Sequence, residues 1–205
     1  MYREHGCIFN LDLKHCYFTP RLGYDRAEIA TEICNLIKQK QKFKEGLNIA
    51  VLFAGVAPYP IIIAKFLLKN FHDIKFKILA IELSKIACFY AKENIKLNKL
   101  EPFIEIKQMD VGKVKQKIKQ KFDLVIACKP RINKHWLSEV FYLVQHDGII
   151  YYYFFAEKNK IKEWINKIKE IASKEKIKIK LSKPKMVREV GPHIYHLRLK
   201  IDLNS

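Results

Sequence analysis

The stretch from Asn48 to Ala64, which reads NIAVLFAGVAPYPIIIA, constrains the fold more than any other part of the chain. Its first apolar run, residues 49–53, has the length and composition of a buried strand, and it stops at a loop of small residues and prolines. The second run, residues 61–64, fits the start of a helix, because Pro60 is tolerated in a first helical turn. A buried strand that turns sharply into a helix is the first unit of a doubly wound α/β sheet, and Gly55 lets a ligand approach the backbone closely.

Two simpler interpretations of this stretch are a transmembrane helix and an α/β core that binds no ligand. The uncharged run from Ile49 to Ala64 is shorter than the ~20 residues that a membrane span requires, and it contains one glycine and two prolines. The ligand-free core is disfavoured by the acidic residues that follow downstream.

The charge of the chain indicates what kind of partner it binds. A formal net charge of +18 favours a polyanion, with RNA, DNA and anionic membrane as candidates. The alternative is a coding bias toward lysine and isoleucine that decorates solvated helix faces. Such a bias raises the number of glutamates as well, and this chain has far fewer glutamates than lysines.

Length and cysteine content set further limits. The chain of 205 residues, 49% of them hydrophobic, can form one sizeable domain with a small appendage. Five cysteines without a CxxC motif predict a reducing compartment, with neither a disulfide framework nor a metal site. The polar start of the chain shows no signal peptide, so a cytoplasmic location is expected.

The order of apolar and charged segments predicts β-α alternation and therefore a mostly parallel sheet, with the last strands able to form an antiparallel edge. Besides residues 49–53, strands are expected at residues 7–13, 75–82, 103–106, 122–127, 149–155, 177–181 and 193–201, with a short extended piece at 17–18. Helices are expected near residues 25–37, 84–95, 111–121, 136–144 and 158–174, with Ser84 as an N-cap. Residues 1–44 are expected to form a small N-terminal β-hairpin and helix subdomain that contacts RNA or substrate, and residues 45–205 the main domain.

Three features fall at the carboxyl ends of the predicted strands, where open α/β sheets bind ligands. They are the loop at Ala54 and Gly55, the acid Glu82 after the second strand, and Asp110 after the third. An acid after the second strand can accept hydrogen bonds from both hydroxyls of a ribose, and one after the third can accept from an adenine amine. No GxGxxG follows the first strand, so the pattern favours a class I AdoMet-dependent methyltransferase over a dehydrogenase.

Several motifs resemble those of one family, the archaeal and eukaryotic tRNA (guanine-37-N1)-methyltransferases. Tyr17–Leu22 followed by Asp25 and Arg26 resembles Y-F-S-P-R-L-x-x-E-R, Leu52–Tyr59 resembles M-F-A-G-V-G-P-F, Ala80–Glu82 matches A-I-D/E, Lys92–Lys99 is close to verbatim, and Gly148–Tyr153 resembles G-V-I-H-Y-Y. These motifs span nearly the whole chain in the family's order.

The resemblance implies methyl transfer from S-adenosyl-L-methionine (AdoMet) to N1 of guanosine 37 in the anticodon loop of tRNA. It implies that the cofactor is held by Tyr17, Phe53, Ala54, Gly55, Glu82, Leu83, Asp110 and Val111. It also implies that Asp25 takes the proton from N1, that Arg21 and Arg26 orient the base and neutralise charge on its O6, and that Pro130 lies in the substrate-facing loop. The partner would be the anticodon stem-loop of tRNA, with no membrane and no DNA.

Four positions depart from the family pattern. Val51 stands where an acid usually begins the first-strand motif, Ala57 replaces a glycine, and Cys128 with Lys129 replaces N-L or P-L before Pro130. Asp25 is shorter than the family's Glu by one methylene, and because ~1 Å of misplacement can cost about 100-fold in rate, slow turnover is expected. The chain also starts inside the family's second domain, so a separate protein that supplies the first one is a further expectation.

Three other functions remain open. A wyosine-pathway aminocarboxypropyltransferase would share the fold and the cofactor, although its relatives usually have Pro-Gly in place of Pro20-Arg21. A catalytically weakened tRNA-binding subunit would explain Val51, Ala57 and Cys128. A methyltransferase for a small molecule is the third.

Overall fold

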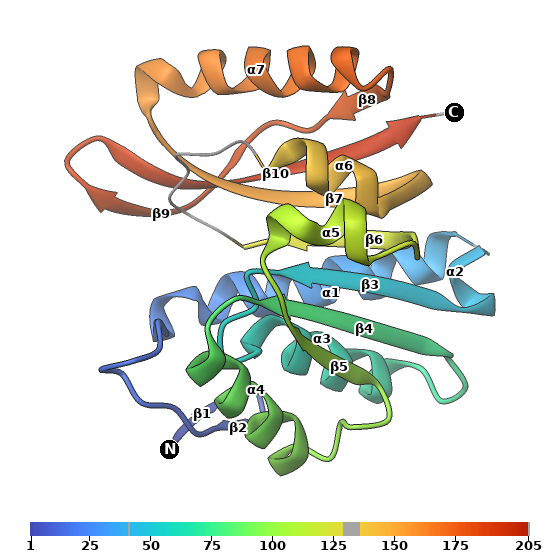
Figure 1. Ribbon diagram of the computed structural model, residues 1–205, viewed down its shortest axis with the longest axis vertical. Coiled ribbons are helices and arrows are strands. Elements are labelled where there is room, and N and C mark those ends of the chain that lie inside the picture. The colour runs from blue at the N-terminus through green and yellow to red at the C-terminus, as the bar shows by residue number, and fades with distance from the viewer. Residues whose placement is uncertain (41, 129–135, 205) are drawn as a thin grey trace. The chain divides into compact units, whose positions relative to one another are not determined.

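The computed structural model describes residues 1–40, 42–128 and 136–204, and the chain divides into two compact units, Met1–Asp110 and Val111–Ser205 (Figure 1). The domain boundary expected after residue 44 lies inside the first unit. None of the five cysteines, all of which lie among the described residues, forms a disulfide, and burial raises the pKa of the Cys7 and Cys88 thiols to about 11.

The first unit begins with a β-hairpin of β1 (Tyr2–Glu4) and β2 (Cys7–Phe9), which pair antiparallel. The hairpin was expected from the sequence, but its strands differ from those predicted. Strand β2 ends at Phe9, whereas the strand predicted from residue 7 continued to residue 13. The partner of β2 is β1, where the sequence had suggested the extended piece at residues 17–18. The backbone N–H groups of Ile8 in β2 and of Asn10 just beyond it donate to the side chains of Asn98 and Asn94, which take the place of a further strand.

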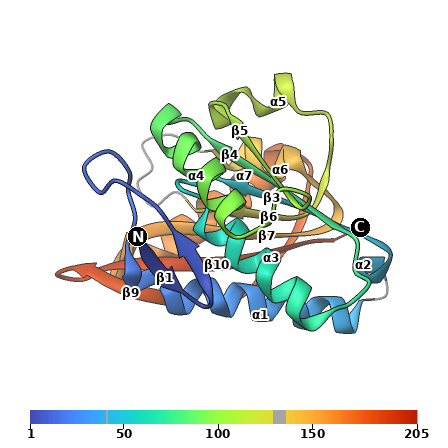
Figure 2. The same ribbon diagram turned by 90° about the horizontal axis from the view of Figure 1, so that it is seen from below.

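The rest of the first unit is a parallel three-stranded layer that helices cover on one face. Its elements are η1 (Pro20–Leu22), α1 (Gly23–Gln39), α2 (Lys42–Glu45), β3 (Leu47–Leu52), α3 (Pro58–Asn70), β4 (Phe76–Glu82), α4 (Lys85–Leu97) and β5 (Ile104–Gln108). Strands β3 and β5 flank β4, and both pairings are parallel. Helices α1, α3 and α4 lie on the same face of these strands, as Figures 1 and 2 show from two directions, and α3 and α4 both contact β2.

Local chemistry fixes where these helices begin. The Ser84 side chain accepts a hydrogen bond from the backbone N–H of Ala87 at 3.2 Å, which confirms Ser84 as the N-cap of α4. Helix α3 starts with Pro58 directly after Ala57, whose backbone is left-handed with φ 66°. No helix among residues 1–40, 42–128 and 136–204 is long and apolar enough to cross a membrane, and the stretch from Ile49 to Ala64 divides into β3, a loop and α3.

The second unit contains a parallel pair of strands extended by antiparallel ones. Its elements are η2 (Val111–Lys113), α5 (Val114–Lys117), β6 (Phe122–Ala127), α6 (Leu137–Leu143), β7 (Val144–Glu157), η3 (Lys158–Lys160), α7 (Ile161–Lys174), β8 (Lys178–Leu181), β9 (Lys185–Gly191) and β10 (Ile194–Asn204). Strands β6 and β7 are parallel, whereas β10 pairs antiparallel with β7, β8 and β9. The mostly parallel sheet with an antiparallel edge is therefore confirmed, and β9 is an additional strand.

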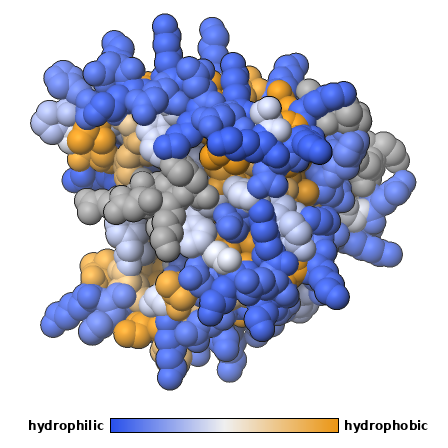
Figure 3. Space-filling model, turned by 45° about the horizontal axis from the view of Figure 1, so that its top comes forward, coloured by the Kyte–Doolittle hydropathy of each residue, from blue (hydrophilic) through white to orange (hydrophobic). Residues whose placement is uncertain are grey.

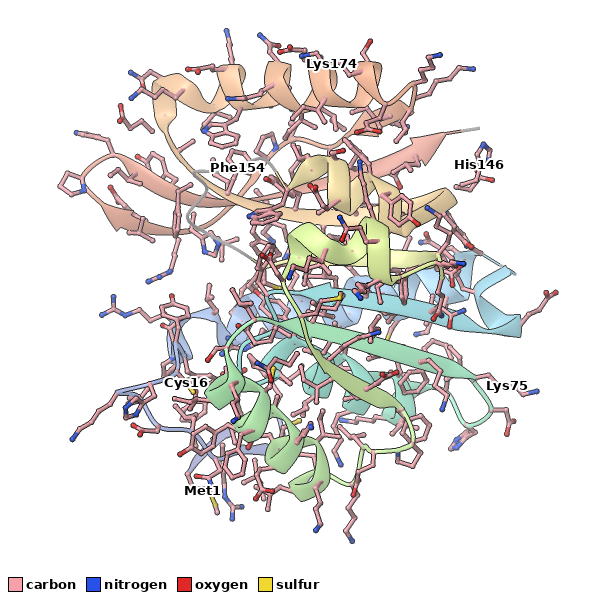
Figure 4. All side chains as sticks on the ribbon, in the orientation of Figure 1. Met1, Cys16, Lys75, His146, Phe154 and Lys174 are labelled. Atoms are coloured by element: carbon pink, nitrogen blue, oxygen red, sulfur yellow. The ribbon has the colours of Figure 1, made fainter. Side chains whose placement is uncertain are left out.

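Helix α7 shows how the second unit combines a core with a basic surface. Trp164 packs its ring 5.6 Å from that of Phe154 on β7, and Ile168 is fully buried. Lys174 projects from the outer side of the helix, as Figure 4 shows. Hydrophilic residues cover most of the molecular face seen in Figure 3, with smaller apolar groups between them.

Candidate active site

The carboxylate of Glu82, at the end of β4, is held by three backbone N–H groups. Gly55 donates to Oε2, and Leu83 and Ser84 both donate to Oε1, each at 2.9 Å. A carboxylate offers about four lone-pair positions, so these bonds leave about one for a ligand hydroxyl. The half-buried side chain is thus prepared to accept from one ribose hydroxyl, and a second hydroxyl would have to displace one of the backbone donors.

The loop after β3 owes its shape to three residues with positive φ. Phe53, Gly55 and Ala57 have φ values of 58°, 57° and 66°. Only glycine adopts this region without cost, and other residues spend of order 1–2 kcal/mol there. A Cβ on Gly55 would lie 3.8 Å from the backbone oxygen of Tyr17, so the structure brings these two predicted cofactor residues together.

The other predicted cofactor residues of the first unit surround this loop. The side chain of Leu83 is 63% exposed and that of Tyr17 is 68% exposed, so both offer apolar surface, while Ala54 is buried. The backbone N–H of Met109 donates to the carbonyl of Glu82 at 2.8 Å, which brings the chain leading to Asp110 alongside the end of β4. Asp110 is half-buried. Val111 is buried in the second unit.

Asp25, the predicted base, is buried in the first turn of α1 with 3% of its surface exposed. Its Oδ2 accepts a hydrogen bond of 2.7 Å from the hydroxyl of Tyr59, which is itself 5% exposed. Tyr59 was not among the predicted site residues. Its sequence signal was weak, because a tyrosine beside two prolines at a helix start is usually a core residue.

Arg26, predicted to orient the substrate base, instead forms a buried ion pair inside the first unit. Its Nε and Nη2 donate to Oε1 and Oε2 of Glu4 at 2.6 and 2.5 Å, and Nη2 also donates to the carbonyl of Thr19 at 3.1 Å. The two side chains are 2% and 6% exposed. A Cβ on Gly23 would lie only 3.0 Å from Glu4 Oε2, so this glycine makes room for the carboxylate. Arg26 therefore ties the hairpin to α1.

Arg21 differs from Arg26 in its surroundings. It lies on η1 and is exposed, and its backbone N–H donates to the hydroxyl of Thr19 at 3.3 Å. Its guanidinium forms no ion pair with the residues that the structure describes, which leaves its donors for a ligand. Pro130 lies outside the described residues.

Asn94 in α4 and Asn98, the C-cap residue of that helix, were also missed as functional residues, although both belong to the motif Lys92–Lys99. Asn98 accepts from the backbone N–H of Ile8 at 3.0 Å and donates to its carbonyl at 2.7 Å. Asn94 accepts from the N–H of Asn10 at 2.6 Å and donates to its carbonyl at 3.0 Å and to that of Val56 at 3.1 Å. Both side chains are buried, so the pair clamps the N-terminal segment and the Gly55 loop to one helix.

A small apolar cluster supports the same junction. Cys16 packs with Val56 and Ala87, and Figure 4 shows it beside α4. Elsewhere in the first unit, a pocket of about 530 Å³ opens between Lys75, Phe76 and Phe103, near the amino ends of β3, β4 and β5. Ligands of open α/β sheets bind at the carboxyl ends, so we assign no role to that pocket.

Comparison with known proteins finds one matching family and several relatives. Residues 1–180 match the family described as TRM5/TYW2 methyltransferase domain. The tRNA (guanine(37)-N(1))-methyltransferase Trm5b of Pyrococcus abyssi is 29% identical over 200 residues, which are 97% of this chain and 54% of the relative. The tRNA (guanine(37)-N(1))/4-demethylwyosine(37)-methyltransferase Taw22 of Nanoarchaeum equitans is 27% identical and is covered over 78% of its length.

The solved structures give the same result. The crystal structure of Trm5b from Pyrococcus abyssi superposes with a TM-score of 0.81 at 26% identity, and the match covers all of this chain and 55% of that one. The chain thus spans about half the length of that relative.

Proposed function

Because the chain belongs to the TRM5/TYW2 methyltransferase domain family, we propose that it transfers a methyl group from AdoMet to N1 of guanosine 37 in tRNA. The observation that carries this proposal is the carboxylate of Glu82, which three backbone N–H groups fix at the carboxyl end of β4. A fixed, half-buried carboxylate at this place suits the ribose of a nucleoside cofactor.

The residues around Glu82 fit AdoMet in their chemistry. The remaining acceptor position of Glu82 would take a ribose hydroxyl, and the exposed side chain of Leu83 would lie against the adenine. Asp110 would accept from the adenine amine, and the small residues Ala54 and Gly55 would leave room for the methionine portion. When bound, AdoMet supplies an electrophilic methyl group.

The first unit also holds groups for the proton chemistry of guanine. N1 carries a proton and is not nucleophilic until that proton leaves. Asp25 accepts the proton, and the guanidinium of Arg21 stabilises the negative charge that then resides largely on O6. As the N1–methyl bond forms, the methyl–sulfur bond breaks and its electron pair stays on sulfur. The products are N1-methylguanosine, S-adenosylhomocysteine and the proton held by Asp25.

The charge distribution supports an RNA substrate. Residues 111–205 contain 22 Lys and Arg against 9 Asp and Glu, a net charge of +13 out of the total of +18. Two stretches contribute most, Lys113–Lys121 with five lysines and Lys174–Lys185 with six. They meet where Lys115 approaches Glu175 at 3.5 Å. Such a lysine surface suits the phosphates of tRNA, and a tRNA substrate agrees with the expected cytoplasmic location.

The test is the nucleoside content of tRNA after incubation with the protein and AdoMet, measured by mass spectrometry. We expect N1-methylguanosine, and an Asp25→Asn variant that binds AdoMet as before but turns over at least 100-fold more slowly. Folded protein that leaves guanosine 37 unchanged under all conditions would falsify the proposal. Methylation of 4-demethylwyosine in place of guanosine would change the substrate but keep the reaction.

Two alternatives have distinct outcomes in the same experiment. An aminocarboxypropyltransferase would leave a nucleoside with the larger group, but Arg21 next to Pro20 favours methyl transfer. A tRNA-binding subunit would show no heat of AdoMet binding in calorimetry and would require a separate chain for activity. Val51 and Ala57 favour this reading, whereas the backbone donors around Glu82 favour a functional cofactor site.

A further inference from the structure

We propose that Tyr59 is a positioning residue, whose hydroxyl holds the carboxylate of Asp25 in the orientation that accepts the N1 proton. This inference rests on the proposed function, because it assigns Asp25 the role of the base. It goes beyond that function by naming a second residue on which the base depends.

The geometry of the two side chains is the first argument. The Tyr59 hydroxyl lies 2.7 Å from Asp25 Oδ2, and both residues are at least 95% buried. Asp25 is in the first turn of α1 and Tyr59 in the first turn of α3, two helices that pack against each other. A buried hydrogen bond to a carboxylate is among the stronger hydrogen bonds in proteins, so it selects one orientation of a side chain whose terminal torsion is otherwise broad.

Tyr59 itself is held rigidly, which a positioning residue requires. It follows Pro58 and the left-handed Ala57, so its backbone is fixed by the loop after β3. The guanidinium carbon of Arg26 lies 5.9 Å from the centre of the Tyr59 ring and 5.1 Å from that of Phe18. The Arg26–Glu4 ion pair therefore braces the ring from the side of the hairpin.

The sequence offers a second, independent argument. In the motifs quoted above, the position of Asp25 is occupied by Glu and that of Tyr59 by Phe. This chain differs at both positions. The acidic side chain is shorter by one methylene, and the aromatic side chain carries an additional hydroxyl group. The structure shows that the added oxygen contacts the shortened side chain. The two differences thus form one paired change, in which the hydroxyl compensates for the shorter reach of Asp25.

The test is a double-mutant cycle on the full chain, with methylation of tRNA as the readout. Tyr59→Phe should lower kcat about 10- to 100-fold while KM for AdoMet changes less than about twofold, because only the orientation of the base is lost. Asp25→Glu alone should also lose activity, since the extra methylene meets the hydroxyl. The double variant Asp25→Glu/Tyr59→Phe should recover activity to within about threefold of the wild type.

Tyr142→Phe serves as the matched control. Its hydroxyl donates to the carbonyl of Ile118 at 3.2 Å in the second unit, so the same substitution there removes a tyrosine hydrogen bond away from Asp25. We expect it to leave kcat unchanged. Thermal unfolding of all variants shows whether each has folded.

Two results would overturn the inference while the proposed function stands. One is a Tyr59→Phe variant with the kcat of an active wild type. The other is a double variant whose activity equals the product of the two single effects, because Tyr59 and Asp25 would then act independently. A wild-type chain that makes no methylated nucleoside contradicts the proposed function itself and is recognised before any variant is compared.

Discussion

At the scale of single residues, the two arginines predicted to act on the base have different surroundings, and this difference can be tested. Glu4→Gln leaves the buried guanidinium of Arg26 without a counter-charge, which costs about 3–5 kcal/mol. We expect a clear loss in the free energy of unfolding, measured by urea titration, with the catalytic residues intact.

Arg21→Gln should show the reverse behaviour. Arg21 is exposed, so its replacement should change stability by less than about 0.5 kcal/mol. Loss of a charged donor to the developing oxyanion should lower kcat by about 100-fold or more. An Arg21→Gln protein that is less stable but turns over normally would show that Arg21 contributes to folding and not to catalysis.

Glu82 provides the second test at this scale. In Glu82→Gln, an amide N–H₂ must face backbone N–H groups that now bond a carboxylate oxygen. We expect AdoMet to bind about 10- to 100-fold more weakly in calorimetry, the equivalent of about 1.5–3 kcal/mol. Glu105→Gln on β5, which removes the same charge from an exposed side chain, should bind AdoMet like the wild type. Equal affinities for both variants would remove Glu82 from the cofactor site.

At the scale of secondary structure, periodicity identified most elements. The apolar run at residues 122–127 is β6. The pattern of apolar and polar residues predicted the ends of β4 and β5 to within one or two positions. The hairpin partner β1 was missed because three residues beside a chain end carry little pattern. Strand β9 was missed because the charged and apolar residues of 185–191 do not alternate and none of them is buried, so their hydrophobicity pattern does not mark a strand.

The site was predicted less completely than the fold, for a physical reason. Glu82 and Asp110 were recognisable because strand ends carry positional meaning in α/β sheets. The partners of Asp25 and Arg26 could not be deduced in this way. Tyr59 is 34 residues from Asp25 and Glu4 is 22 residues from Arg26, and no local pattern relates side chains that far apart.

The asparagine clamp of α4 gives a test at the scale of the element. Asn94→Leu removes the partner of the part-buried backbone N–H and C=O of Asn10 and of the buried carbonyl of Val56, at about 1–3 kcal/mol for the buried group. We expect faster amide hydrogen exchange at Asn10 and lower stability. Asn70→Leu, which breaks an exposed bond to the carbonyl of Phe66, should change neither. Unchanged exchange at Asn10 would mean that water replaces Asn94 as the hydrogen-bond partner of its backbone N–H and C=O.

At the scale of the whole molecule, the uneven charge predicts where RNA binds. The logarithm of tRNA affinity should fall linearly with the logarithm of salt concentration, with a slope of about 0.7–0.9 for each phosphate contacted. Replacing the exposed Lys178, Lys180 and Lys183 with Gln should reduce that slope measurably.

The control changes the same charge in the first unit. Lys69, Lys75 and Lys99 are exposed there, and their replacement with Gln should reduce the slope much less. Equal reductions by the two triple variants would mean that binding follows total charge rather than the lysines of the second unit.

The clamp on the N-terminal segment has a consequence for how freely the sequence can drift. Asn94 and Asn98 recognise main-chain groups of residues 8 and 10 and ignore the side chains there. This contact therefore does not depend on which side chains residues 8 and 10 carry, whereas it requires the side-chain amides of Asn94 and Asn98. We therefore expect this contact to tolerate substitutions at residues 8 and 10 and to be lost on substitution of Asn94 or Asn98.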